Sequence, residues 1–257
     1  MAKIITIGLQ KGGVGKTTTA GTLCYLLAED GYKVLGVDMD SQSNLSNLLT
    51  QHDDTYFEGS TVLEAIEAGE VEPYIYKVTE NLHVLPSDDY LATLAKFLYT
   101  EWKGKNQSLA LRELLDQVRD QYDYIVIDTP PSLSEPMVNA ICASDYVVVL
   151  AESSKWAFNA IPRFLETVEF SQQNINPGLK VAGILRTMND VRRADSKAFV
   201  EVIGEEYPEL CFDVVIRRKA STGRISLEGL FDNKELNQAL DQYQEFYKEL
   251  LQRVESR

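Results

Sequence analysis

The sequence predicts an α/β protein: one domain with a mostly parallel, twisted central sheet that is flanked by helices on both faces. Short apolar runs alternate with helical patterns almost from one end of the chain to the other. Several of these runs are apolar throughout, which is typical of strands that are covered on both faces. The chain of 257 residues, 44% of them hydrophobic, has no repeat, linker or break in composition, so we expect residues 1–257 to form a single domain.

The expected elements are assigned in chain order from these patterns. Strands are expected at residues 3–8, 33–38, 81–86, 122–128, 145–150, 180–187 and 211–216. Helices are expected at residues 16–29, 61–68, 89–99, 108–119, 157–172, 195–205 and about 233–254. Because a helix between two strands lets the chain return in the same direction, the strands are expected to be parallel. The last helix spaces its apolar residues three or four apart, so we expect it to pack on the core.

Composition excludes some classes of protein. With 25 Lys and Arg against 39 Asp and Glu, the net charge is −14, which argues against a protein that coats nucleic acid with its whole surface. A local basic patch remains possible because salt screens charges beyond about 8–10 Å. No apolar run approaches the roughly 20 residues that span a bilayer. Cys24, Cys142 and Cys211 are far apart and lie in apolar segments, so we expect buried, reduced thiols in a cytoplasmic protein.

A glycine-rich loop joins the first expected strand to the first expected helix. Its residues are Lys11, Gly12, Gly13, Val14, Gly15, Lys16, Thr17 and Thr18. The glycines let consecutive backbone N–H groups point at phosphate oxygens, and the helix that follows adds the positive end of its dipole. Lys16 would neutralise the β- and γ-phosphates, and the Thr17 hydroxyl would be a ligand of Mg²⁺. The loop therefore predicts a binding site for the phosphates of a nucleotide together with magnesium.

The loop departs from the pattern GxxxxGK[ST], because its first glycine is replaced by Gln10 and a second lysine follows at Lys11. In this respect it resembles the deviant Walker A ATPases of the ParA/MinD family. The resemblance implies a P-loop NTPase fold, ATP and Mg²⁺ as cofactors, and an ATPase of weak intrinsic activity. In that family the extra lysine reaches the phosphates of the partner's ATP, so Lys11 would take this role in an ATP-dependent homodimer.

A second segment, residues 37–44, resembles the family's DxDPQGN segment at the end of a strand. The resemblance assigns Asp40 to orient the attacking water, as a carboxylate can by accepting a hydrogen bond from it. Asp38 would support the site near Mg²⁺ or the loop. Ser41 and Ser43 stand where the family has proline and glycine.

Two further segments follow in the order of the family. Residues 125–132 resemble its Walker B segment, and Asp128 at the end of an apolar strand would hold Mg²⁺ through a water. Residues 182–192 resemble the GIL-x-TMYD-x-R segment of the DNA-partitioning ParA branch, in which Met188 and Asn189 would lie near the adenine.

Cationic residues cluster near two expected strand ends in the second half of the chain. They are Arg192, Arg193 and Lys197 in one cluster, and Arg217, Arg218, Lys219 and Arg224 in the other. Two such clusters could form a stripe that contacts phosphates without reading sequence. The ParA resemblance implies a DNA-segregation ATPase that binds non-specific DNA as an ATP dimer, associates with the nucleoid in that state, and is reset when a centromere-binding, ParB-like partner stimulates hydrolysis.

Two other classes share the loop. A MinD-like membrane-cycling ATPase needs a basic amphipathic C-terminal helix, whereas residues 233–257 are mixed to acidic. Among metabolic ATPases, iron–sulfur carriers need cluster cysteines, for which Cys142 and Cys211 have no suitable companions. A bacterial tyrosine kinase would have a tyrosine-rich tail, which is lacking here. Sequence alone distinguishes neither plasmid from chromosomal cargo nor the partner protein.

Overall fold

The computed structural model describes residues 1–103, 105–190, 192, 194–219, 224–225, 229–231 and 236–255. An eight-stranded sheet has the strand order β3-β4-β2-β5-β1-β6-β7-β8. Its strands are β1 (Lys3–Gly8), β2 (Val34–Asp38), β3 (Tyr76–Lys77), β4 (Leu82–Leu85), β5 (Tyr124–Asp128), β6 (Tyr146–Glu152), β7 (Lys180–Asn189) and β8 (Cys211–Arg217). Only the pair β3 and β4 is antiparallel among these strands; all other pairs are parallel. The predicted fold class is confirmed.

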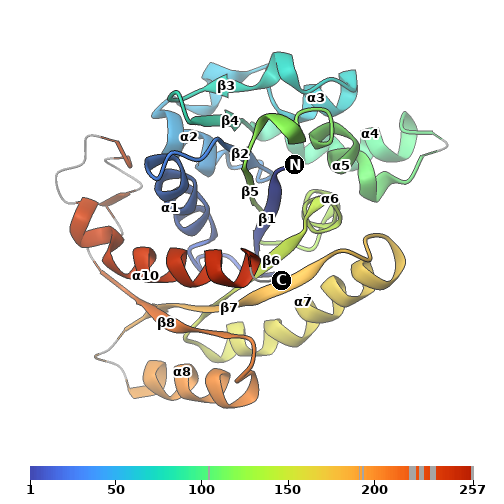
Figure 1. Cartoon of the computed structure of the whole chain (residues 1–257). Helices are drawn as coiled ribbons and strands as arrows, with labels where there is room; N and C mark the ends of the chain where they lie inside the picture. Colours follow the sequence, from blue (N-terminus) through green and yellow to red (C-terminus); the bar gives the residue numbers. More distant parts are fainter. Residues whose placement is uncertain are drawn as a thin grey trace.

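Helices cover both faces of the sheet (Figure 1). One face carries α1 (Lys16–Glu29), α2 (Asn44–Thr50) and α10 (Leu236–Glu255). The other face carries α3 (Val62–Ala68), α4 (Leu94–Thr100), α5 (Ala110–Leu115), α6 (Glu135–Ala143), α7 (Lys155–Asn174) and α8 (Ala194–Glu206). Both faces bury apolar side chains against the sheet, and the larger of the two apolar clusters includes residues of α1, α2 and α10 as well as of α6, α7 and α8.

The central strands are almost entirely buried, as their continuous apolar runs predict. Every residue of β2 and β5 is buried, and only Lys3 of β1 is partly exposed. Phe164 of α7 lies so close to the end of β1 that a Cβ at Gly8 would be 2.6 Å from its ring. Glycine at this position therefore lets α7 pack directly over the strand that leads into the phosphate loop.

Two expected helices are shorter than predicted. Residues 89–99 begin as a 3-10 turn (Asp89–Thr93), and only Leu94–Thr100 form α4. Residues 108–119 contain α5 between two 3-10 turns at Gln107–Leu109 and Arg119–Gln121. Helix α6 and the two-residue strand β3 were not predicted.

The C-terminal helix packs on the core. Its buried residues are Leu240, Tyr243, Phe246, Tyr247, Leu250 and Val254. They face α1, β7 and β8, and the Tyr247 hydroxyl donates to Asp30 Oδ2 over 2.7 Å. None of the helices within the described residues is both long and apolar enough to cross a membrane.

The three cysteines are buried and unpaired, as expected. Burial raises the pKa of the Cys24, Cys142 and Cys211 thiols, which keeps them protonated and unreactive at neutral pH.

Candidate functional site

The glycine-rich loop lies at the carboxyl edge of the sheet, between the end of β1 and the start of α1. Gly13 and Gly15 have φ values of 76° and 87°, in the left-handed region that favours glycine. Gly15 is the N-cap of α1, so the free N–H groups of the first helical turn face the cavity beside the loop. This cavity has a volume of about 530 Å³ and is lined by Gly12, Gly13, Gly15, Lys16, Thr17, Thr18, Asp40, Gln42, Asn44, Asn47, Leu48, Pro131 and Met188.

Lys16 provides the positive charge of the cavity. Its side chain is only 7% exposed, and its Nζ donates to the Lys11 carbonyl oxygen over 2.8 Å. Burial lowers the pKa of Lys16, while the nearby carboxylates of Asp128 and Asp40 act to raise it. A ligand phosphate in the cavity would favour the charged ammonium further.

Thr17 and Asp128 form the oxygen-rich wall of the site. The Thr17 hydroxyl donates to Asp128 Oδ2 over 2.6 Å, and the Thr129 N–H donates to Asp128 Oδ1 over 3.0 Å. Adjacent strands place Asp128 beside Asp38. Burial, with the charge of Asp38 as the next cause, raises the pKa of Asp128 to about 8.

Asp38 supports the loop that follows β2. Its Oδ2 accepts hydrogen bonds from the Ser46 N–H and hydroxyl, each over 2.8 Å, and its Oδ1 accepts from the Asp40 N–H over 3.1 Å. Burial raises its pKa to about 6, although the bonds from Ser46 and the Asp40 N–H oppose this shift. With both oxygens engaged, Asp38 fits the supporting part of its predicted role better than direct contact with a metal.

Asp40 lines the same cavity as the glycine-rich loop. It is 9% exposed, and its Oδ1 accepts a hydrogen bond from the Gln42 N–H over 3.1 Å. Lys16 and Thr17 also line this cavity. The carboxylate predicted to orient a water therefore lies in the same space as the residues predicted to hold phosphate and magnesium.

The residues present fit a magnesium nucleotide. The carboxylates of Asp40 and Asp128 act on the buried ammonium of Lys16, and Asp38 and Asp40 both act on Asp128, so a divalent cation would relieve the repulsion among the three carboxylates. The Thr17 hydroxyl and the Asp128 carboxylate are the hard oxygen donors that Mg²⁺ prefers. Burial and the charge of Asp38 place the Asp128 carboxylate in a dry, negatively charged surrounding that a divalent cation would stabilise.

Two residues of the site have left-handed backbone without being glycine. Ser43, at φ 54°, stands where the family has glycine, and Met188 has φ 53°. A Cβ at Gly15 would lie 3.3 Å from Met188 Cε, so Met188 lies against the phosphate loop. The neighbouring Thr187 hydroxyl donates to the Val14 carbonyl over 2.7 Å, which ties the end of β7 to the loop. Of the two predicted adenine neighbours, Met188 lines the cavity, and Asn189 is the last residue of β7.

Lys11 is directed toward the turn between β6 and α7. Its Nζ donates to Glu152 Oε2 over 2.5 Å and to the Ser154 hydroxyl over 3.0 Å. Sequence reasoning missed both partners. They stand 141 and 143 residues away from Lys11 along the chain, and only the adjacency of β1 and β6 brings them together.

The predicted basic clusters lie at the ends of the adjacent strands β7 and β8. The strand register pairs Asn189 with Arg217, so the residues after β7 and the end of β8 are neighbours. Arg192, Lys197, Arg217, Arg218 and Arg224 are exposed. Lys219 is half-buried and forms an ion pair with Asp241, and Arg193 lies outside the described residues.

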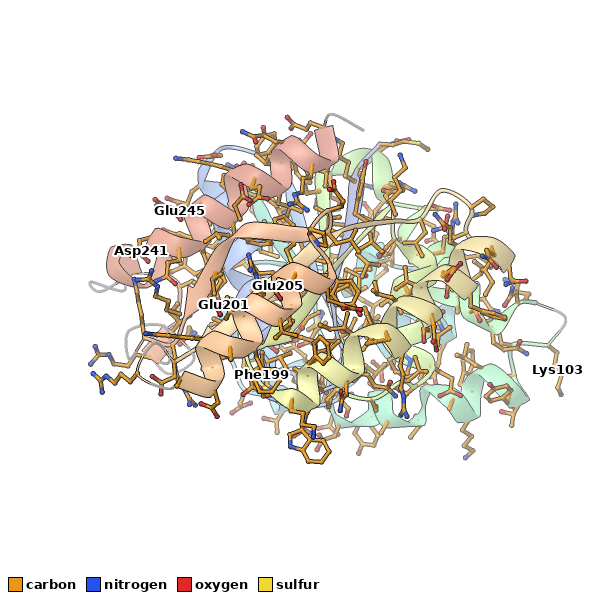
Figure 2. The ribbon with its side chains drawn as sticks, turned by 90° about the horizontal axis from the view of Figure 1, so that it is seen from below. Lys103, Phe199, Glu201, Glu205, Asp241 and Glu245 are labelled. Atoms are coloured by element: carbon orange, nitrogen blue, oxygen red, sulfur yellow. The ribbon has the colours of Figure 1, made fainter. Side chains whose placement is uncertain are left out.

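Exposed carboxylates lie on both helices that pack against β8. Glu201 and Glu205 on α8 and Asp241 and Glu245 on α10 belong to the two helices that flank β8 on opposite faces of the sheet (Figure 2). Arg217 thus ends β8 and Arg192 follows β7, Lys197 lies on α8, and both flanking helices also carry carboxylates.

Several residues of the cavity wall were not singled out as site residues from the sequence. They are Gln42, Asn44, Asn47, Leu48 and Pro131. Gln42, Asn44 and Pro131 belong to the segments that resemble the family, and that resemblance was the signal that could have found them. Asn47 and Leu48 lie on α2, and only the packing of α2 against α1 brings them to the cavity.

Comparison with known proteins agrees with this geometry. The profile of the family described as AAA domain matches residues 2–181. The chromosome partitioning protein ParA of Myxococcus xanthus is 34% identical over 220 residues, which cover 85% of this chain and 76% of that protein. A structure of cobyrinic acid a,c-diamide synthase from Mycobacterium smegmatis, with bound ATP analog and magnesium, has a TM-score of 0.83 at 29% identity over 100% of this chain and 97% of that one. A putative plasmid partition protein from Borrelia burgdorferi, bound to AMPPNP, has a TM-score of 0.79 at 27% identity over 100% and 99% of the two chains.

Proposed function

The chain belongs to the ParA/MinD family of deviant Walker A P-loop ATPases, and from this premise we propose that it is a DNA-segregation ATPase. In this proposal the protein dimerises on binding MgATP and binds non-specific DNA as a dimer. A centromere-binding, ParB-like partner then stimulates its slow hydrolysis and resets it. The protein would be cytoplasmic, and nucleoid-associated in the ATP-bound state.

The observation that carries the proposal is the second lysine. Lys11 precedes the glycines of the loop, and its Nζ binds Glu152 and Ser154, whereas Lys16 lines the cavity. A lysine held outside the phosphate cavity of its own subunit is available to the phosphates of another. This arrangement supports a homodimer in which each subunit completes the site of its partner.

The roles of the remaining residues follow from their positions around the cavity. The loop N–H groups and Lys16 would bind the β- and γ-phosphates. The Thr17 hydroxyl and Asp128 would hold Mg²⁺, which when bound neutralises charge on the phosphates. Asp40 would accept a hydrogen bond from the attacking water and align it with the γ-phosphate. The hydrogen bond from the Asp40 N–H to Asp38 would keep the Asp40 loop in place.

DNA binding would use the ends of β7 and β8. Arg217 and Arg218 are exposed there, next to the segment that contains Arg192. In a dimer this set of cations occurs twice, which would make DNA affinity depend on ATP. Because exposed cations would contact phosphates and the two flanking helices also carry carboxylates, the contact would be local and strongly weakened by salt.

The test is DNA binding measured with ATP, ADP and no nucleotide across a salt series. We expect binding to random duplex DNA only with ATP, with a negative dependence of log affinity on log salt. The double variant Arg217→Ala, Arg218→Ala should bind DNA with a shallower dependence of log affinity on log salt. The slope should fall by about 1 for each phosphate that a subunit no longer neutralises. Arg163→Ala, an exposed cation on α7, is the matched control and should leave the slope unchanged. Equal or absent binding in all three nucleotide states would contradict the DNA role.

The MinD-like alternative requires an amphipathic helix whose apolar face can reach a membrane. The apolar face of α10 is buried against α1, β7 and β8, and its exposed face carries Asp241 and Glu245 together with Lys248. This helix offers a membrane neither apolar area nor a mainly basic surface, so we favour DNA over lipid. Co-sedimentation with anionic liposomes in the presence of ATP would reverse this preference.

The likeness to a protein named as a cobyrinic acid a,c-diamide synthase suggests a metabolic alternative. We favour segregation because the signature lysine and the residues around Asp40 and Asp128 follow the partition family. ATP hydrolysis measured with and without cobyrinic acid separates the two, since only a synthase would be stimulated by it.

A further inference from the structure

We propose that Glu152 is a cis latch: in the free subunit it holds Lys11 through an ion pair, and this pair must open before Lys11 can reach the ATP of a second copy. The inference rests on the proposed ATP-dependent dimer and adds to it a positioning residue that sets how readily the dimer forms. It assigns a role to the turn between β6 and α7, which the phosphate-binding residues do not use.

The latch is built from three contacts. Lys11 Nζ donates to Glu152 Oε2 and, over 3.0 Å, to the Ser154 hydroxyl. The two charged side chains are 24% and 32% exposed, so the pair is partly shielded from water. Ser154 is also the N-cap of α7, where its Oγ accepts a hydrogen bond from the Ala157 N–H over 3.3 Å. The lysine is thus held on a rigid helix start.

The fold fixes the position of the turn. Strand β6 pairs with β1 up to Gly8 and Val149 and then extends three residues further to Glu152. The Ser153 N–H donates to the Thr187 carbonyl over 3.3 Å, which ties the turn to β7. Because the turn is anchored on both sides, Glu152 cannot follow Lys11 toward another subunit, and the ion pair has to break.

The cavity beside the turn is lined by other cations that can pair with Glu152. Lys155 and Arg218 line the same cavity of about 280 Å³ as Glu152 and Ser154. Asp190 and Asp195 line it as well, so the local field contains both signs of charge. When Lys11 leaves, Glu152 can therefore pair with another cation. The free-energy cost of opening the latch is then only the difference between the Glu152–Lys11 pair and the pair that replaces it.

The size of the effect follows from the exposure of the pair. An ion pair of this exposure changes an equilibrium by about threefold. Two latches open for each dimer, so removing the carboxylate should tighten ATP-dependent dimerisation by roughly tenfold. Glu152→Gln is the appropriate change because it keeps the size and the hydrogen-bonding oxygen while removing the charge. Ser154→Ala is a poorer test, since it also removes the cap of α7.

The first experiment uses the nucleotide-free protein. The rate at which Lys11 is acylated by an N-hydroxysuccinimide ester is measured by peptide mass spectrometry in the wild type, Glu152→Gln and Glu166→Gln. Glu166 is an exposed carboxylate on α7, 11 residues beyond Lys155 and therefore about 16 Å along the helix. We expect Lys11 to react about threefold faster in Glu152→Gln only. Equal rates in all three proteins would overturn the latch.

The second experiment measures dimerisation directly. Sedimentation equilibrium with MgATP is performed on Asp40→Ala proteins that also carry Glu152→Gln or Glu166→Gln. We expect the dimer dissociation constant of the Glu152→Gln protein to be roughly tenfold lower than that of Asp40→Ala alone, and the Glu166→Gln protein to match Asp40→Ala. A weaker dimer in Glu152→Gln would mean that Glu152 acts across the interface. This result would overturn the latch but not the proposed ATP-dependent dimer. If Asp40→Ala itself stays monomeric with ATP, the proposed function fails together with the latch.

Discussion

Replacing Asp128 by asparagine should make the nucleotide-free protein more stable while destroying its response to MgATP. Asp128 is fully buried, and burial together with the charge of Asp38 raises its pKa to about 8. A carboxyl group whose pKa is raised on folding contributes stability below its unfolded pKa, near 4, and that stability is lost as the pH rises through about 8. The wild type without ligand should therefore lose stability between pH 5 and pH 8.5.

The magnitude follows from the pKa. Each pKa unit corresponds to about 1.4 kcal/mol, so the ionised carboxylate costs at most about 6 kcal/mol above pH 8. Asparagine removes this cost but keeps only one acceptor for two donors, the Thr17 hydroxyl and the Thr129 N–H, which costs about 1–3 kcal/mol. After allowance for the higher effective dielectric constant of real sites, we expect a net gain of about 2 kcal/mol at pH 8.5. The gain should vanish near pH 5, where Asp128 is protonated.

The assay is thermal unfolding at pH 5.5 and pH 8.5, with and without MgATP. At pH 8.5 the Asp128→Asn protein should melt about 4–8 °C above the wild type in the absence of ligand. MgATP at 100 times its dissociation constant stabilises the wild type by about 2.7 kcal/mol, and this increase should be lost in the variant. Asp116→Asn, at an exposed carboxylate, should change neither property. A variant that is less stable than the wild type at pH 8.5, or that keeps its full response to MgATP, would refute the reasoning.

Four further changes test the site. Lys16→Ala should abolish ATP binding in isothermal titration calorimetry, since no other buried cation within the described residues lines the cavity; retained affinity would refute the loop assignment. Asp40→Ala should keep ATP binding and the dimer but stop phosphate release, and normal turnover would move the water-orienting role elsewhere. Trp156 is 77% exposed beside the Lys11 latch, so the proposed dimer would bury it. In a Trp102→Phe protein, where Trp156 is the one remaining tryptophan, the fluorescence should therefore shift to the blue with ATP and not with ADP; an unchanged spectrum would place Trp156 outside the interface. Ser43→Gly should raise the melting temperature by about 2–4 °C, because it relieves left-handed strain of about 1 kcal/mol; a lower melting temperature would show that the Ser43 side chain stabilises its turn.

The sheet could be predicted because its strands are buried on both faces and leave continuous apolar runs in the sequence. The helical regions at 89–99 and 108–119 were less predictable because side-chain caps start tight turns inside them. The Asp88 side chain accepts a hydrogen bond from the Tyr90 N–H, and the Asn106 side chain accepts one from the Ser108 N–H. Such local caps compete with a continuous helix, and the apolar periodicity alone does not reveal them.

Other elements left too little signal. Helix α6 spans only Glu135–Ala143, with a proline in its first turn, so it contains about two and a half turns of periodicity. Strand β3 has two residues and exists only through its pairing with β4. Both depend on tertiary packing, which outweighs local preference in short segments.

The candidate site also has a part that the sequence predicts and a part that it does not. The phosphate loop could be predicted because one continuous segment supplies the glycines, Lys16 and Thr17, and local backbone chemistry requires that spacing. Asp38 and Asp128 could be assigned from the strands that end in them, since the register places these two residues side by side. The contact of Lys11 with Glu152 could not be predicted, because it depends on β6 lying next to β1. No single segment of the sequence determines the order of strands in a parallel sheet.

The site therefore depends on the order of the strands as much as on the sequence motifs. Parallel strands place all their carboxyl ends at one edge, and the order β2-β5-β1-β6-β7 brings five loops to the same cavity region. The loops after β2, β5 and β1 would supply the phosphate and metal chemistry, whereas β6 supplies Glu152 and β7 supplies Met188. Because β6 lies between the phosphate loop and the basic strand ends, its turn is in contact with both Lys11 and the cavity that Arg218 lines. A change in the partner of Lys11 would thus alter the charge balance next to Arg218 directly, which gives a short physical route from the nucleotide to the proposed DNA surface.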